Sequence, residues 1–177
     1  LILFFRRRLL YYICFANGIN GKKMKRLLLL LAAAVVSFTS VSAQEAGQWT
    51  IGPRANIYTN TGDGAILGLG AFARYNLTDA WRLEPAITAL FHSGCSVDIN
   101  CDVHYMFELT RGWTLYPVAG LTISELGDWA LGMNLGVGTD FAVARNWDLT
   151  AGVKWMPVFE NSRKNPVVIT IGGCYKF

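Results

Sequence analysis

The sequence has 177 residues, of which 53% are hydrophobic and 16% are charged, and its formal net charge is +4 with a pI of about 9.0. Seven of the 16 Lys and Arg residues and none of the 12 Asp and Glu residues precede Gln44, which leaves nine basic and 12 acidic residues and a net charge of about −3 from Gln44 onward. The basic pI therefore belongs to the N-terminal segment, and the rest of the chain lacks the basic surface on which nucleic-acid binding depends.

Residues 24–43 have the composition of a secretory signal peptide. Met24-Lys25-Arg26 is followed by an almost wholly apolar run from Leu27 to Val36 and then by Val41-Ser42-Ala43. A short basic region, about ten apolar residues and a small-x-small ending favour export and cleavage after Ala43. The sequence thus predicts that residues 44–177 form the exported domain.

Residues 1–23 hold two apolar patches separated by Arg6-Arg7-Arg8. These patches fall short of the about 20 apolar residues that a spanning helix needs. Two interpretations are open: a membrane anchor ahead of the signal peptide, or an over-extended start upstream of a true start at Met24. We favour the second and expect residues 1–23 to have no structural role.

Four tryptophans recur at nearly equal intervals in the exported domain. Trp49, Trp81, Trp113 and Trp147 are separated by 32, 32 and 34 residues, and each opens a segment that alternates in polarity. A repeat of this kind is typical of an array of β-hairpins with one rim marked by indole rings. The pattern predicts the aromatic girdle of a transmembrane β-barrel.

The segments between the turn signals predict strands rather than helices, because apolar and polar residues alternate within them. We expect eight strands, each near the length that crosses a bilayer at a tilt. Their ranges are 49–58, 65–75, 81–91, 97–109, 113–123, 129–142, 147–157 and 167–177. The connections before the tryptophans are compact and the others are looser, so the tryptophan rim is expected on the periplasmic side. The predicted fold class is all-β, an eight-stranded antiparallel up-and-down transmembrane β-barrel.

Polar residues occupy one face of each predicted strand. In the fourth strand Asp98 and Asp102 alternate with Ile99 and Val103. Charged groups cannot face acyl chains without a large cost, so the polar face is predicted to line the lumen. The predicted lumen charge network consists of Arg54, Arg74, Arg82, Lys154 and Lys176 with Glu84, Asp102, Glu108, Asp140 and Asp148. In a barrel of this size such side chains are expected to fill the interior rather than to line a channel.

Three prolines follow a tryptophan at the same offset, namely Pro53, Pro85 and Pro117, and Pro157 lies in the last tryptophan segment. Each removes a hydrogen-bond donor from a strand, so we expect a local bulge or bend at a fixed depth.

The cysteines of the exported domain leave two interpretations open. Cys95 and Cys101 bracket a short polar stretch, and an oxidising compartment would allow a disulfide between them; alternatively, both are free together with Cys174. His92 and His104 are the only histidines, and no metal-ligand spacing is present. No metal and no cofactor is therefore predicted.

The last strand resembles the C-terminal sorting signal of bacterial outer-membrane proteins, with Thr170, Gly172, Tyr175 and Phe177 at the characteristic positions. With the alternating strands and the tryptophan rim, residues 44–177 resemble the small outer-membrane β-barrels of the porin superfamily, of the OmpX and OmpA type. The resemblance implies that the barrel-assembly machinery recognises the last strand and that Tyr175 and Phe177 matter for insertion.

No catalytic signature accompanies this resemblance. We therefore expect a non-enzymatic, monomeric outer-membrane protein surrounded by outer-membrane lipid, with a structural or surface-interaction role and no nucleic-acid partner. One alternative is a narrow porin-like channel or a carrier of small hydrophobic molecules, lined by Phe72, Leu90, Tyr116 and Val118. A lipid-modifying enzyme based on His92-Ser93 and a soluble lipocalin-like barrel are less favoured, since the latter would have no use for a tryptophan rim.

Overall fold

The computed structural model describes residues 46–62, 64–91, 95–126, 129–159 and 164–177. The leader predicted over residues 1–23, the signal peptide predicted over residues 24–43 and the His92-Ser93 pair lie outside these ranges. Among the described residues, no helix has the length and apolar character needed to cross a membrane.

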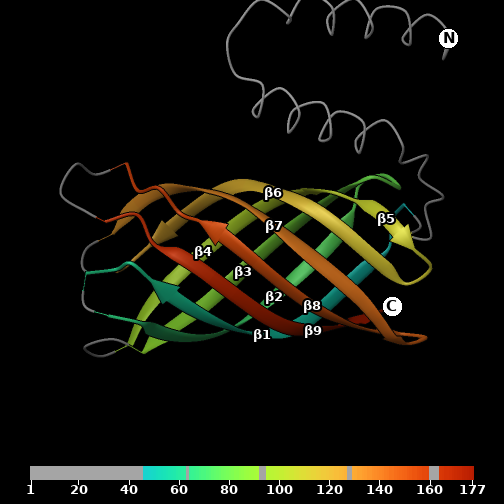
Figure 1. Cartoon of the computed structure of the whole chain (residues 1–177), viewed down its shortest axis with the longest axis horizontal. Coiled ribbons are helices and arrows are strands. Elements are labelled where there is room, and N and C mark those ends of the chain that lie inside the picture. Colours follow the sequence, from blue (N-terminus) through green and yellow to red (C-terminus); the bar gives the residue numbers. More distant parts are fainter. Residues whose placement is uncertain (1–45, 63, 92–94, 127–128, 160–163) are drawn as a thin grey trace, which may run out of the picture. The chain divides into compact units, whose positions relative to one another are not determined.

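Nine β-strands run through the described residues (Figure 1). Their bounds are β1 Trp49–Thr59, β2 Ile66–Asn76, β3 Trp81–Phe91, β4 Cys95–Tyr105, β5 Phe107–Thr110, β6 Trp113–Ser124, β7 Ala130–Ala144, β8 Trp147–Trp155 and β9 Val167–Lys176. β4 and β5 count as one strand of the barrel, because both pair with β6 and only Met106 separates them. The described sheet therefore has eight strands, each antiparallel to its neighbours, which confirms the predicted fold class.

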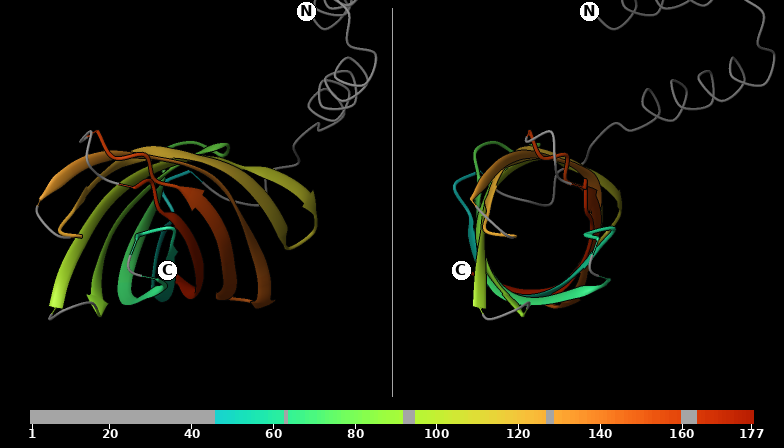
Figure 2. Two further views of the ribbon diagram at one scale, coloured as in Figure 1. Left: turned by 60° about the vertical axis from the view of Figure 1, so that its left-hand side comes forward. Right: turned by 90° about the vertical axis from the view of Figure 1, so that its left-hand side faces the viewer.

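The sheet closes on itself through its first and last strands. β1 pairs with β2 on one side and with β9 on the other, and β4 pairs with β6 to complete the ring. Ile57 lies opposite Ile169 at this closure, and Ile51 lies opposite Tyr175. Seen nearly along the barrel axis, the strands surround a single interior (Figure 2). Closure removes the free strand edges, at which other chains could otherwise pair.

The strands are long enough to form a band of membrane thickness. β3 runs from Trp81 to Phe91, and ten residue steps of about 3.3 Å at a tilt near 40° give a height of about 25 Å. This is the height of the apolar band on outer-membrane barrels.

Three prolines interrupt the β-ladder at one depth. The β1–β9 pairing skips the positions around Pro53, the β2–β3 pairing skips those around Pro85, and the pairing of β6 with β4 and β5 skips those around Pro117. On the opposite side of each proline the ladder continues, with Pro53 opposite Ala71 and Pro117 opposite Val137. Because proline has no N–H group, each interruption falls where a donor is missing. The register is the same on both sides of each interruption, so the ladder loses pairings at these prolines without the extra residue of the predicted bulge.

The range predicted for β3 matches the observed one, and the other predicted ranges differ from the observed strands by one or two residues at an end. Two of these differences involve a strand break or a proline. The strand predicted over residues 97–109 begins at Cys95 and breaks at Met106, whose N–H donates to the carbonyl of Ala80 at 2.7 Å. The strand predicted over residues 147–157 ends at Trp155, so Pro157 lies outside β8. The break at Met106 follows from Pro117 on β6. Because proline has no N–H group, the ladder between β6 and the β4–β5 strand is interrupted beside it.

Candidate functional site: the barrel lumen and its aromatic rims

The barrel is polar inside and apolar outside. Along β1 every second residue is buried, and Arg54 is only 5% exposed whereas Ile51 is 50% exposed. Most of the buried side chains on the strands are charged, amide or hydroxyl groups, and most of the large aliphatic side chains point outward. This distribution is the reverse of a water-soluble protein, in which polar groups face the solvent.

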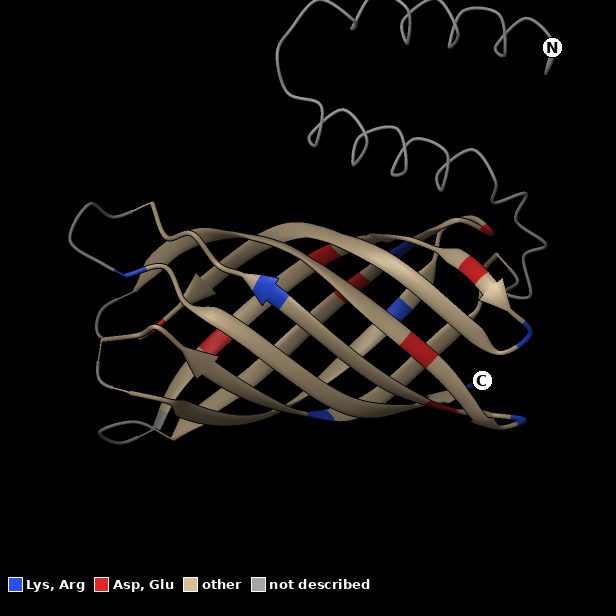
Figure 3. Cartoon of the chain, in the orientation of Figure 1, with Lys and Arg blue, Asp and Glu red and all other residues tan. Residues whose placement is uncertain are grey.

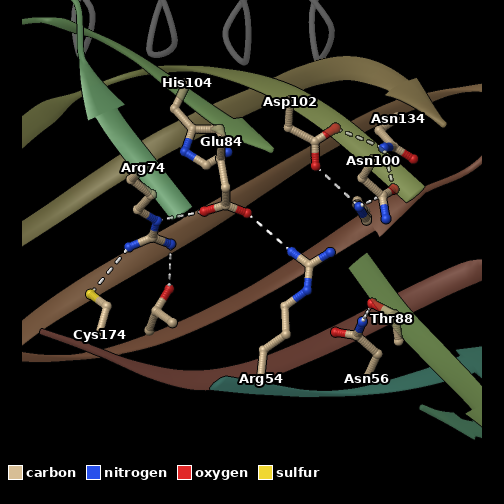
Figure 4. A network of polar contacts seen from close by, with 12 residues as sticks. Arg54, Asn56, Arg74, Glu84, Thr88, Asn100, Asp102, His104, Asn134 and Cys174 are labelled. Carbon is tan, nitrogen blue, oxygen red and sulfur yellow. Dashed lines mark hydrogen bonds and ion pairs between the residues drawn. The ribbon is translucent and has the colours of Figure 1, made fainter. Parts of the chain in front are cut away.

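Arg74 is the centre of the ion-pair network in the lumen (Figure 4). Its Nε donates to Glu84, and its Nη1 donates to Asp140 Oδ1 at 3.1 Å. Its Nη2 donates to Tyr116 Oη at 3.1 Å and to Thr150 Oγ1 at 3.0 Å. One guanidinium group thus joins residues from four other strands, and a planar group with five donors suits such a position.

Two further arginines extend this network. Arg54 Nη1 donates to Glu84 Oε1 at 3.1 Å, and Arg82 Nη1 donates to Asp140 Oδ2 at 2.8 Å. Arg82 also donates to His104 Nδ1 and lies over the ring of Tyr116 at 4.6 Å. Because a guanidinium can only donate, His104 accepts through Nδ1. Each carboxylate of this group is therefore shared between two arginines.

A second polar cluster lies beside the first and centres on Asp102. Lys154 Nζ donates to Asp102 Oδ2 at 3.1 Å and to Asn100 Oδ1 at 2.9 Å. Asn134 Nδ2 donates to the remaining oxygen of Asp102 at 2.7 Å (Figure 4). Asp98 completes the cluster by accepting hydrogen bonds from Tyr58, Thr122 and Asn100.

An apolar layer separates these clusters from the end of the barrel opposite the tryptophan rim. It consists of Tyr58, Ile66, Leu90, Met156 and Val168, all at most 3% exposed, with Leu126 packed against them. The hydroxyl of Tyr58 reaches Asp98, so the apolar layer adjoins the polar cluster directly.

The predicted network residues divide into two groups. Arg54, Arg74, Arg82, Glu84, Asp102, Asp140 and Lys154 are buried and joined in the clusters described above. Lys176 pairs with Asp148 at 2.7 Å near the tryptophan rim, where the lysine is 20% exposed, and Glu108 on β5 is only partly buried. Charged residues accordingly lie both along the strands and in the turns at the ends of the barrel (Figure 3).

The sequence pattern did not assign the uncharged partners of this network. Tyr116, Thr150 and Asn134 bind the charged groups, yet the prediction selected residues by charge alone. Tyr116, Thr150 and Asn134 occupy inward-facing positions in the alternation of their strands, and this pattern could have identified them.

Glycines on the inner face make room for the long side chains. A Cβ atom on Gly138 would lie 2.3 Å from the ring of Tyr116, and a Cβ atom on Gly120 would lie 2.2 Å from Asp102 Oδ1. Such contacts are too short for any side chain, so these positions accept only glycine unless the neighbour moves.

Gly138→Ala is expected to displace Tyr116 and to lower the free energy of unfolding by about 1–3 kcal/mol, as overpacking does. Urea unfolding of the folded protein in detergent or lipid would measure this loss. Gly173→Ala is the matched control, because its Cβ would meet no atom closer than 3.8 Å. Equal stabilities of the two variants would contradict the prediction.

The four repeated tryptophans lie at one rim, and each faces another aromatic residue across the ladder. The pairs are Trp49 with Tyr75, Trp81 with Tyr105, Trp113 with Phe141, and Trp147 with Tyr175. Ring centroids in the first two pairs are 4.8 and 4.9 Å apart. These pairs give the rim eight aromatic rings, of which the repeat revealed half, and Phe107 and Phe177 pack on Tyr105 and Tyr175 beside them. At the opposite rim lie Phe91, Trp129, Trp155 and Phe159, all exposed.

The residues of the predicted assembly signal lie on and after β9. Tyr175 packs on Trp147 with a centroid distance of 5.4 Å, and Phe177 donates its N–H to the carbonyl of Trp49 at 3.1 Å. A Cβ atom on Gly172 would lie 2.7 Å from the carbonyl of Pro53, so this position is a close approach of β9 to β1. Thr170, which is partly buried, lies opposite Asn56.

The disulfide considered between Cys95 and Cys101 is not formed. Cys101 is a free, exposed cysteine on β4, and Cys174 is free and buried. Cys95 and Cys101 lie on the same extended strand. Six residue steps of about 3.3 Å separate their backbones by about 20 Å, whereas a disulfide requires Cα atoms about 4.4–6.8 Å apart.

The lumen of the described barrel contains a small cavity. A cavity of about 40 Å³ lies beside the network and is lined by Arg54, Phe72, Tyr116 and Val118 among others. Glu84, Asp102 and His104 also reach this cavity, and their ligand atoms lie within 4.8 Å of one another. Both carboxylates already face arginine or lysine, and His104 faces Arg82, so the surrounding charge disfavours a metal ion.

No family model and no curated protein sequence matches the chain. Solved structures do match. The N-terminal β-barrel domain of OprF from Pseudomonas aeruginosa is similar with a TM-score of 0.64 at 18% identity, covering 76% of this chain and all of that one. Neisserial surface protein A matches with a TM-score of 0.57 at 20% identity, over 75% of this chain and 98% of that one.

The attachment invasion locus protein Ail of Yersinia pestis is also similar, with a TM-score of 0.54 at 14% identity over 76% of this chain and 100% of that one. These identities are low, so the similarity concerns the course of the backbone. That backbone, with its inverted polarity and its aromatic rims, has the fold of the small eight-stranded outer-membrane β-barrels.

Proposed function

We propose that this protein is an integral outer-membrane β-barrel with a side-chain-filled lumen and a structural or surface-interaction role in the cell envelope. The observation that carries the proposal is the inverted polarity of the described barrel. Ion pairs fill its interior, and aliphatic side chains form an outer band about 25 Å high between two aromatic rims. In water this outer surface would be a large exposed apolar patch, which soluble monomers rarely have.

The filled lumen favours a structural role over transport. A cavity of about 40 Å³ admits water molecules, whereas sites for small organic ligands occupy roughly 300–1,000 Å³. The expected carrier residue Leu90 belongs to the apolar layer, and Phe72 is packed with Ala86 and Cys174. These contacts support side-chain filling rather than a binding site for hydrophobic molecules or a narrow channel.

We infer no catalytic role for the described polar residues of the lumen. His104, Asp98 and Asp102 are held in the lumen by hydrogen bonds or ion pairs to other side chains. None of the hydroxyl groups bonded to these residues has a histidine base beside it, as a serine-type nucleophile requires.

Reconstitution of the exported domain into planar bilayers tests this proposal. We expect β-strand content with heat-modifiable migration on gels, and no steady single-channel openings. Steady openings from pure protein would overturn the filled-lumen role in favour of a channel. Protein that stays in the aqueous phase during detergent partition would overturn the membrane location.

A further inference from the structure

Two arginines lie on neighbouring turns at the tryptophan rim. Arg111 is in the turn between β5 and β6, where Gly112 has a φ of 84°, and Arg145 is in the turn between β7 and β8. Both side chains are exposed. Among the ion pairs and hydrogen bonds within the described residues, none involves either guanidinium group.

The fold places these two turns side by side. The carbonyl of Gly112 accepts a hydrogen bond from the N–H of Ala142 at 2.7 Å, so the turn that carries Arg111 contacts the last residues of β7. Arg145 follows β7 directly. With a strand spacing of about 5 Å and steps of about 3.3 Å, the two backbones lie about 10 Å apart or less. Two long arginine side chains can reach one charged group across that distance.

The depth of the turns is set by the aromatic rim. Trp113 and Trp147 follow the two arginines by two residues each, and indole rings prefer the boundary between acyl chains and headgroups. β7 continues past the level of Phe141 to Ala144. In a barrel that spans a bilayer with its tryptophan rim at this boundary, the two arginines would lie just outside it, at the level of the lipid phosphates.

The two turns are positively charged, and the acid nearest to Arg111 along the chain, Glu108 on β5, is partly buried and has an interaction of its own. The turns Arg111-Gly112 and Arg145-Asn146 contain no acidic residue. Asp140 and Asp148, the nearest acids along β7 and β8, are buried and paired with Arg74, Arg82 and Lys176. A guanidinium binds phosphate through two parallel hydrogen bonds, which makes arginine better suited to this partner than lysine.

We propose that Arg111 and Arg145 form a binding site for the phosphate of an anionic phospholipid headgroup at the tryptophan rim. This inference rests on the proposed membrane location. The site would hold the β7–β8 side of the barrel to its leaflet, and its partner is a lipid of the bilayer itself.

The test measures preference for anionic lipid in folded, full-length protein. Vesicles contain phosphatidylcholine with increasing phosphatidylglycerol whose chains are brominated, and quenching of tryptophan fluorescence reports lipid next to the barrel. Trp113 and Trp147 adjoin the site and serve as reporters. Each arginine is expected to raise the preference for phosphatidylglycerol over phosphatidylcholine roughly five-fold, and this preference should fall at high salt.

The Arg111→Gln, Arg145→Gln double variant is expected to lose this preference. The Arg111→Lys, Arg145→Lys variant keeps both positive charges, so it should keep the part of the lipid preference that falls at high salt. Lys164→Gln, which removes an exposed charge outside this rim, should leave the preference unchanged. Equal preference in the native protein and the double Gln variant, with both shown to be inserted by heat-modifiable migration, would overturn this inference alone. Failure of the native protein to insert would overturn the proposed function and this inference with it.

Discussion

Replacing Arg74 with methionine is expected to lower the free energy of unfolding of the barrel by about 3–5 kcal/mol. Arg74 is 3% exposed and shares Glu84 and Asp140 with two other arginines. Without Arg74, the buried carboxylates of Glu84 and Asp140 keep one arginine partner each. The guanidinium N–H groups that donate to Tyr116 Oη and Thr150 Oγ1 are also lost. A broken buried pair costs this much because the remaining charge keeps its desolvation penalty.

Urea titration in detergent micelles, followed by tryptophan fluorescence, would measure the effect. Lys164→Met is the control for loss of an exposed charge and should change the free energy of unfolding by no more than about 0.5 kcal/mol. Arg74→Lys should lie between the two, because it keeps the charge but not the fork of donors. A loss below about 1 kcal/mol for Arg74→Met would mean that the lumen network contributes little to stability.

Ile87→Arg is expected to cost about 2–4 kcal/mol when the barrel is folded into a bilayer. Ile87 is 53% exposed and lies midway along β3 on its outer face. If this face meets acyl chains, the guanidinium must be placed near the bilayer centre, where a charge is most unfavourable. On a water-soluble barrel the same position would face solvent, and the substitution would be nearly neutral.

Leu77→Arg is the matched control, since Leu77 is similarly exposed but lies in the turn after β2 at the tryptophan rim. Its cost should be about 0–1 kcal/mol, because the penalty falls toward the interfaces. Unfolding in phospholipid vesicles would compare both variants. Equal free energies of unfolding for Ile87→Arg and Leu77→Arg would argue against a membrane-spanning band.

Much of the strand pattern was predictable from the sequence because it is local. β3 was predicted with the bounds that the structure has, and the inward positions of Arg82 and Glu84 followed from a period of two. The position of Trp81 at the strand start came from the repeat. Each of these features depends only on neighbouring residues along one strand.

Features that depend on two strands were harder to predict. The break at Met106 arises beside Pro117 on another strand, so no pattern within residues 97–109 signals it. The disulfide interpretation treated Cys95 as a loop residue, whereas β4 already begins there. Likewise, Tyr105 and Phe141 complete the aromatic rim only because the register sets them opposite Trp81 and Trp113.

The sequence by itself determined which side of each strand is polar, because alternation on a pleated strand needs no partner. The tertiary structure alone decided which charges meet. Arg74 and Asp140 are 66 residues apart in the chain, and Tyr58 and Asp98 are 40 apart. Their contacts exist because antiparallel register and closure of β1 on β9 bring the inner faces of distant strands within hydrogen-bond reach, and that register is a property of the whole barrel.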